Sequence, residues 1–288
     1  MIQYQIMTWL YYSLGVAISF ALLNVFSRVL TIESKNPRAF SIVFNLICII
    51  MSVILLVITN SYKSFSLPTR IDAWFFLLLA SFFYGLNERF RFLISKLLEA
   101  SVYSIISNIT VIMAFIISLF LYGEKLTITK LLGSAFIIFS TFLVSEIKRS
   151  KISAKGLSLA IMTSVILGIA VSLDKKGAIF FSPETYNILT WVVPFIVLYF
   201  PGIKINEIKA EFKQFSWKII LLAFFNFIGF YLGLKAFILA DATKVIPIIQ
   251  LSTIITVLIG VFFLHEKNHF YKKIIAGAIA VIGVFLLR

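Results

Sequence analysis

The chain has 288 residues, of which 61% are hydrophobic and 13% are charged, with a mean hydropathy of +1.04. Soluble domains average about 45–50% apolar and about 25% charged residues, so this composition excludes an ordinary soluble globule. The net charge of +14 could suit nucleic acid, but most Lys and Arg residues lie between apolar runs, so we expect contact with lipid headgroups and no nucleic acid.

Ten apolar runs follow one another along the chain, separated by short polar links. The predicted spans cover residues 8–30, 38–60, 73–97, 100–121, 127–145, 156–179, 183–200, 216–240, 243–264 and 269–287. Each run can cross about 30 Å of hydrocarbon as a helix, whereas an open sheet would leave backbone groups unpaired in lipid. The first run is too long for a signal-peptide core and has no basic residue before it, which favours a true span. The sequence therefore predicts an all-α polytopic membrane protein with ten transmembrane helices.

An internal repeat relates the two halves of the chain. The landmark pairs are Pro37 and Pro183, Trp74 and Trp217, Glu124-Lys125 and Glu266-Lys267, and Lys130 and Lys273, at offsets of 142 to 146 residues. Chance likeness between apolar helices would not align their interruptions as well. We predict two five-helix repeats, residues 1–150 and 151–288. Because five is odd, the second repeat enters the membrane inverted, which is an arrangement suited to alternating access around a midplane site.

The repeated Glu-Lys pairs each end a fourth span and begin a fifth. The preferred interpretation is a turn and cap, because Glu124 and Glu266 precede a helix whose first N–H groups lack partners. A role in binding a coupling ion is the alternative.

Two segments carry a resemblance to a known family. They are "LEASVYSIISNITVIMAFIISLFLYGEKLTITKLLGSAFIIFSTFLV" (98–144) and "LADATKVIPIIQLSTIITVLIGVFFLHEKNHFYKKIIAGAIAVIGVFLL" (239–287). Each begins a helix with small residues, places a Glu in a hairpin and continues into a helix rich in small residues. The chain thus resembles ten-helix, EamA-type members of the drug/metabolite transporter superfamily. The resemblance implies a cavity lined by helices one, three, four, six, eight and nine. One departure is that the fourth span lacks the mid-helix proline that the ninth has at Pro247.

Polar side chains near the centres of the spans are the candidate substrate-binding residues, because such groups usually face the interior of a bundle. They are Asn24, Tyr84, Asn87, Glu88, Asn108, Asn226, Tyr231 and Gln250. Asn108 and Gln250 occupy equivalent positions in the two repeats. They could bind a zwitterionic or polar metabolite together, or equally form a hydrogen bond between helices.

The charges within the spans allow two interpretations each. Glu88 could relay protons, but Arg91 lies three residues later on the same helix face, and an ion pair is favoured. Arg28 and Lys175 could select for an acidic substrate. The simpler interpretation is that their side chains extend to the membrane–water interface. Pro247 should bend the ninth span.

The chain shows no sequence pattern typical of metal, cofactor or nucleotide chemistry. His265 and His269 lie in one hairpin without a nearby third ligand, so we expect no metal site and no cofactor. There is no phosphate-binding Gly loop followed by Lys, so transport would run on a gradient or by exchange. Cys48 is the single cysteine and excludes an internal disulfide. The expected protein is not an enzyme.

The orientation in the membrane stays open. Roughly two thirds of the Lys and Arg residues lie at the odd-numbered links, which by the positive-inside rule places both termini outside. Members of the resembled family usually have both termini inside.

The leading functional hypothesis is a secondary transporter, working by alternating access, that exports a small metabolite or drug-like solute across the cytoplasmic (inner) membrane. An exchanger or importer of an anionic metabolite on the same fold is the alternative. A membrane enzyme acting on lipid, or an accessory subunit, is less favoured. The expected assembly is a monomer or a homodimer.

Overall fold

The computed structural model describes residues 2–64, 67–98, 100–144, 153–263 and 270–287, and this part of the chain is helical throughout its regular structure. The first half contains α1 (Ile2–Glu33), α2 (Pro37–Ile58), a short 3-10 helix η1 (Ser61–Ser64), α3 (Ile71–Leu97), α4 (Ala100–Tyr122) and α5 (Ile128–Val144). The second half contains α6 (Ala154–Phe180), α7 (Pro183–Tyr199), α8 (Ile205–Phe215), α9 (Trp217–Leu239), α10 (Ala242–Ile249), α11 (Leu251–Phe263) and α12 (Phe270–Leu287).

The surface of the bundle is apolar over wide areas. Large hydrophobic side chains are exposed on α2, α5 and α12, among them Ile54, Phe139 and Val281. A monomer that faced water would expose patches of only a few hundred Å², so this surface faces lipid. Within the described residues, four helical segments are long and apolar enough to cross a membrane: Thr8–Ser27, Pro37–Ile58, Ala154–Phe180 and Trp217–Leu239. The count of ten spans stays a prediction, because other helices in the described part are shorter or carry more charge.

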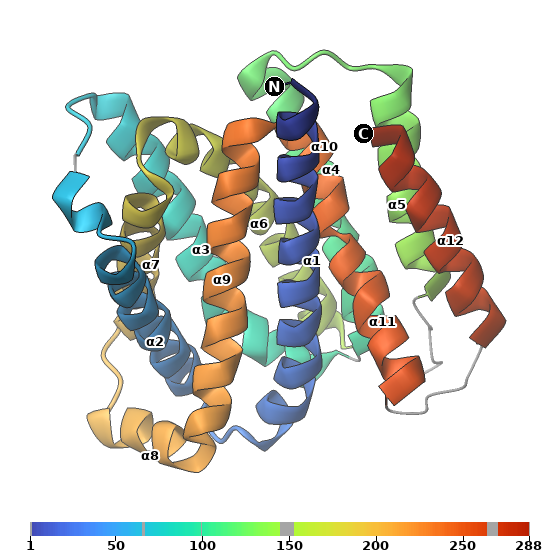
Figure 1. The fold of residues 1–288 in the computed structure, drawn as a ribbon. Helices are drawn as coiled ribbons and strands as arrows, with labels where there is room; N and C mark the ends of the chain where they lie inside the picture. Colours follow the sequence, from blue (N-terminus) through green and yellow to red (C-terminus); the bar gives the residue numbers. More distant parts are fainter. Residues whose placement is uncertain (1, 65–66, 99, 145–152, 264–269, 288) are drawn as a thin grey trace.

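The two halves interleave rather than forming two separate bundles (Figure 1). In the repeat, α1 corresponds to α6 and α3 corresponds to α9. Helix α1 packs mainly on α9, and α6 packs mainly on α3, so these two most extensive interfaces are equivalent to each other. The same correspondence relates the packing of α1 on α10 and α11 to that of α6 on α4. Helix α2 packs on α7 and α5 packs on α12, so each of these interfaces joins a helix to its own counterpart in the other half. This is the packing expected of two like-built repeats around a pseudo-twofold axis.

The halves also run in opposite directions. The ring of Trp9, near the start of α1, lies 5.9 Å from Nζ of Lys244 in α10. Lys175, near the end of α6, lies 3.8 Å from Asp241, which immediately precedes α10. The start of α1 and the end of α6 are therefore at the same end of the bundle, as are both chain termini in Figure 1.

Two of the predicted helix starts are confirmed by their caps. The side chain of Asn36 accepts hydrogen bonds from the amides of Arg38 and Ala39, each at 3.2 Å, and Pro37 is the first residue of α2. In the second half, Ser182 accepts from the amide of Thr185 at 3.2 Å before α7. The capping side chain accepts a hydrogen bond from an N–H group that has no partner within the helix, and the proline has no N–H group that would need a partner.

The predicted bend in the ninth span is a break between two helices. Pro247 cannot donate a backbone hydrogen bond, and three residues later α10 ends and α11 begins around Gln250. The amide of Gln250 donates to the carbonyls of Ile246 and Pro247, at 3.3 and 3.1 Å. The irregular turn places a polar side chain at the interruption.

Helix α8 was not predicted. Its sequence, INEIKAEFKQF, is too polar for a spanning helix, and its strongly one-sided apolar face identifies it as amphipathic. Glu211 of α8 accepts hydrogen bonds from the Ser34 hydroxyl at 3.0 Å and the Asn36 amide at 2.6 Å. Helix α8 thereby ties the α1–α2 link to the second half.

Candidate functional site

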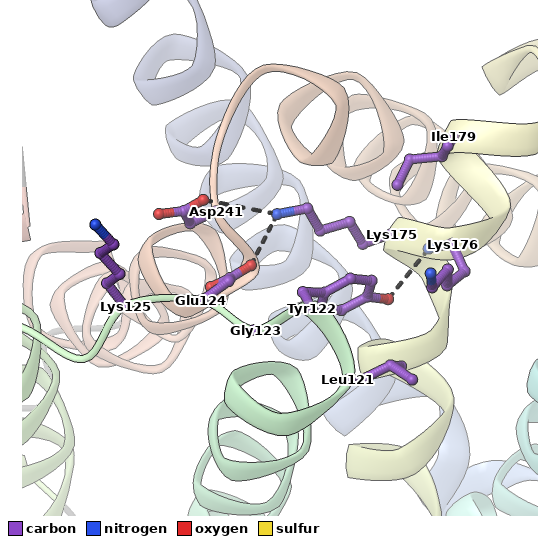
Figure 2. Close-up of a pocket in the computed structure, with 9 residues that line it drawn as sticks. All are labelled: Leu121, Tyr122, Gly123, Glu124, Lys125, Lys175, Lys176, Ile179 and Asp241. Atoms are coloured by element: carbon purple, nitrogen blue, oxygen red, sulfur yellow. Dashed lines mark hydrogen bonds and ion pairs between the residues drawn. The ribbon is translucent and has the colours of Figure 1, made fainter.

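A charged cluster joins the two halves at the end of the bundle that carries the termini (Figure 2). Its centre is Glu124, in the link between α4 and α5. One carboxylate oxygen of Glu124 accepts from Nζ of Lys175 in α6 and from the amide of Ala242 in α10, at 2.7 and 2.8 Å. The other accepts from the amide of Thr243 at 3.0 Å and from its hydroxyl. One carboxylate thus holds α4, α6 and α10 together.

A second carboxylate extends this cluster. Asp241 pairs with Nζ of Lys130 in α5 at 2.7 Å and lies 3.8 Å from Nζ of Lys175. Burial by itself raises the pKa of Asp241, but the hydrogen bond and charge of Lys130, with the charges of Lys175 and Lys244, hold this pKa below its ordinary value. Asp241 is therefore ionised at neutral pH. We call Glu124, Lys130, Lys175 and Asp241 the end cluster.

The structure confirms that Glu124 caps a helix, but the prediction of which helix it caps was wrong. Glu124 caps the first N–H groups of α10 in the other half, not those of the following α5. A negative charge at a helix N-terminus meets the positive end of the helix dipole and two unpaired donors. The matching prediction for Glu266 lies outside the described residues.

A cavity of about 580 Å³ lies beside the end cluster. It is lined by Leu121, Tyr122, Gly123, Glu124, Lys125, Lys175, Lys176, Ile179 and Asp241. Its lining combines carboxylates, ammonium groups and an aromatic ring, so it suits a polar solute or its water shell better than an apolar one.

The two amides at equivalent repeat positions meet in the interior. Nε2 of Gln250 donates to Oδ1 of Asn108 at 3.2 Å and to the hydroxyl of Thr253 at 3.2 Å. The same Asn108 oxygen accepts from the Thr141 hydroxyl at 2.7 Å. Asn108 is buried and Gln250 is partly buried. The α10–α11 break therefore brings a polar group from each half to one point.

The other predicted site residues are dispersed. Tyr84 donates to Asp174, and Tyr231 donates to Glu184 at 2.6 Å. Glu88 pairs with Arg91 at 2.9 Å, the ion pair favoured by their spacing.

The three predicted asparagines other than Asn108 lie at separate places. The Asn87 carbonyl oxygen is buried without a partner in the described part. Asn226 lies 3.9 Å from Sγ of Cys48, and Asn24 is exposed. The Arg28 side chain lies outside what the structure describes, whereas Lys175 belongs to the end cluster.

Asp174 is a buried carboxylate that sequence reasoning missed. It is 3% exposed, and its two oxygens accept from the Tyr84 hydroxyl of α3 and the Tyr186 hydroxyl of α7, the latter at 3.1 Å. Gly177, one turn later in α6, makes room for the Tyr186 ring, because a Cβ there would lie 2.0 Å from that ring's Cε2 atom. The sequence "DKKG" offered one signal, an acidic residue inside an apolar run.

We expect Gly177→Ala to destabilise the protein. The added methyl group must displace the Tyr186 ring, which is fully buried, and loosen its bond to Asp174. A cost of about 1–3 kcal/mol should appear as a lower melting temperature in detergent. Gly277→Ala is the matched control, because a Cβ there meets no atom of the described residues within 4 Å. That control should match or exceed the wild-type melting temperature; equal values for both variants would contradict this packing.

Comparison with known proteins gives the family and the fold. A family model described as "EamA-like transporter family" matches residues 7–146 and again residues 154–288. No curated protein matches the chain. One solved structure, described as "Crystal structure of protein", is similar to this chain with a TM-score of 0.67 and 14% sequence identity. The match covers 95% of this chain and 97% of the other chain. At that identity the likeness shows the fold alone.

Proposed function

Because the chain belongs to the EamA-like transporter family of small-solute membrane transporters, we propose that it is a secondary transporter of a small polar solute. In this proposal the multi-pass protein resides in the cytoplasmic membrane, and the solute binds between the halves. Their relative movement then exposes the site to one side and afterwards to the other.

The contact between Asn108 and Gln250 is the observation that carries this proposal. A broken helix exposes backbone carbonyls and a polar side chain where a regular helix would satisfy its own groups. Here the break at Gln250 faces Asn108 of the opposite half. A solute with both donors and acceptors can replace this amide–amide bond without leaving buried groups unpaired.

Flux through purified protein in lipid vesicles tests the function. Vesicles would be loaded with zwitterionic amino acids, polyamines or carboxylate metabolites, and exchange of labelled solute would be measured in both directions. We expect saturable flux for one class, above that of protein-free vesicles. Absence of flux for all classes would contradict the proposal.

We expect Gln250→Leu to lower this flux at least about tenfold while leaving the melting temperature nearly unchanged. Hydrogen bonds between membrane helices contribute only about 0.6 kcal/mol on average, so loss of the bond to Asn108 alone should cost little stability. Gln214→Leu, on the surface helix α8, loses only an exposed hydrogen bond to the Glu33 carbonyl, so it is the control and should keep full flux. If Gln250→Leu instead melts lower and transports normally, the amides join helices and do not contact solute.

An anionic solute is the second candidate, favoured by the cavity beside the end cluster. Lys175 is neutralised by two carboxylates, but Lys125 and Lys176 in the same lining have no ion pair within the described chain. The carboxylate arm of the flux screen decides between the candidates.

A further inference from the structure

Asp174 has no compensating cation among the residues that the structure describes. It is buried in α6, one residue before Lys175 of the end cluster, and among the described residues no Lys or Arg is within ion-pair distance of it. Its hydrogen-bond partners, Tyr84 and Tyr186, are neutral phenols. An ionised carboxylate at such a position is costly unless it binds a cation.

The described groups around Asp174 come from four helices, and none of them brings a positive charge toward it. Tyr84 approaches from α3 and Tyr186 from α7, and the Tyr122 hydroxyl of α4 bonds to backbone groups on either side of Asp174. From α9, Phe230 packs on the rings of Tyr84 and Tyr186, with centroid distances of 5.7 and 6.4 Å.

The neighbouring lysines of α6 point elsewhere. Nζ of Lys175 bonds to Glu124, and Nζ of Lys176 lies over the rings of Phe76 and Tyr122, at 5.8 and 5.7 Å. The positive charges beside Asp174 in sequence are therefore directed to other partners.

The space around Asp174 fits only a very small cation. Tyr186 is fully buried, Tyr84 is 8% exposed, and the cavity lining at this end of the bundle does not include Asp174. An organic ammonium group would need room that these rings occupy. A proton needs none, and the two phenol hydroxyls stabilise the carboxylate when the proton leaves.

A connection runs from the cavity to this part of α6. The Tyr122 ring lines the cavity, and its hydroxyl donates to the Ser172 carbonyl and accepts from the Lys176 amide, at 3.1 Å for the latter. Those two backbone groups pair with each other in a regular helix. They flank Asp174, so a movement of Tyr122 with the end cluster would alter α6 at Asp174.

We propose that Asp174 is the proton-binding group that couples solute movement to a proton gradient. This inference rests on the proposed transport function and specifies what drives it. The step is a balanced proton transfer: protonated Asp174 releases one proton to water on one side, leaving a carboxylate held by Tyr84 and Tyr186, and takes one up on the other side.

Two measurements test this on the full-length protein. The first is an infrared titration, in which the carbonyl band of a protonated carboxyl group is followed against pH. We expect a band that titrates in the wild type and is missing in Asp174→Asn. Asp72→Asn, at an exposed carboxylate, should keep the band. A spectrum that is the same in wild type and Asp174→Asn would overturn the proposal, and this readout needs no transported solute.

The second measurement separates exchange from coupling. With a solute found to be exchanged, Asp174→Asn should keep solute exchange but lose accumulation driven by a pH gradient. Tyr84→Phe removes one donor to the carboxylate, so the pH midpoint of flux should rise by roughly one to two units. If Asp174→Asn does not fold, the pH midpoint of Tyr84→Phe alone tests whether Asp174 binds the coupled proton. Gradient-driven accumulation that survives in Asp174→Asn, or an unmoved midpoint in Tyr84→Phe, would overturn the proposal. Absence of all wild-type flux would instead count against transport itself.

Discussion

Replacing Glu124 by alanine should lower both the melting temperature and solute flux. The side chain of Glu124 is 4% exposed and holds Lys175 together with the first residues of α10. Removing one partner of a buried ion pair costs about 3–5 kcal/mol, and losing a helix cap adds about 1 kcal/mol. If the substitution destabilises one of the two conformations, open to one or the other side of the membrane, by about 3 kcal/mol, the ratio of their populations changes roughly 100-fold. Thermal melting and initial flux rates measure both effects.

Two comparison variants separate this effect from a general loss of charge. Asp72→Ala removes an exposed ion pair with Arg70 and should cost less than about 1 kcal/mol. Glu124→Gln combined with Lys175→Met removes both charges and should be less destabilised than Glu124→Ala. If Glu124→Ala behaves like Asp72→Ala, the end cluster does not hold the halves together.

Arg91→Leu should be the most destabilising single substitution in α3. It leaves Glu88, whose side chain is 6% exposed, without its ion-pair partner. The second oxygen of that carboxylate already has no hydrogen-bond partner among the described residues. The expected cost is about 3–5 kcal/mol. Chemical or thermal unfolding in detergent measures it.

Arg89→Leu is the matched control for this prediction. Arg89 donates to the carbonyls of Val197 and Phe200, at 3.1 and 2.6 Å, and forms no ion pair in the described chain. Its loss should cost clearly less. Adding Glu88→Gln to Arg91→Leu should recover part of the stability; no recovery would show that Arg91 acts by its packing on Phe44 and Phe92.

Local features of the fold could be predicted because their partners are close in sequence. The caps at Asn36 and Ser182 depend on donors two or three residues away. The Glu88–Arg91 pair follows from helical spacing, and the break near Gln250 follows from the chemistry of Pro247. The Asn108–Gln250 contact was also indicated, because a pseudo-twofold axis can bring equivalent positions together.

Features that depend on tertiary packing could not be predicted. The interleaving of the halves is set by which helix faces fit together, and a single sequence does not reveal this. Asp174 was missed because its partner Tyr84 is 90 residues away. Helix α8 escaped a search by hydropathy, although Ile205, Ile208, Phe212 and Phe215 recur at helical spacing.

Cross-linking across the end cluster tests the central claim, that the two halves move relative to each other during transport. In a Cys48→Ala background, Lys125→Cys follows Glu124 directly in sequence, and Ile238→Cys lies three residues before Asp241. The two thiols are therefore on different halves, and the four residues of the end cluster are unchanged. Flux would be measured before bridging with a bifunctional thiol reagent, after bridging, and after reduction of the bridge. The account predicts that bridging lowers flux to background and that reduction restores it, whereas the same reagent leaves each single-cysteine variant active. A bridged protein that transports at its original rate would contradict the account.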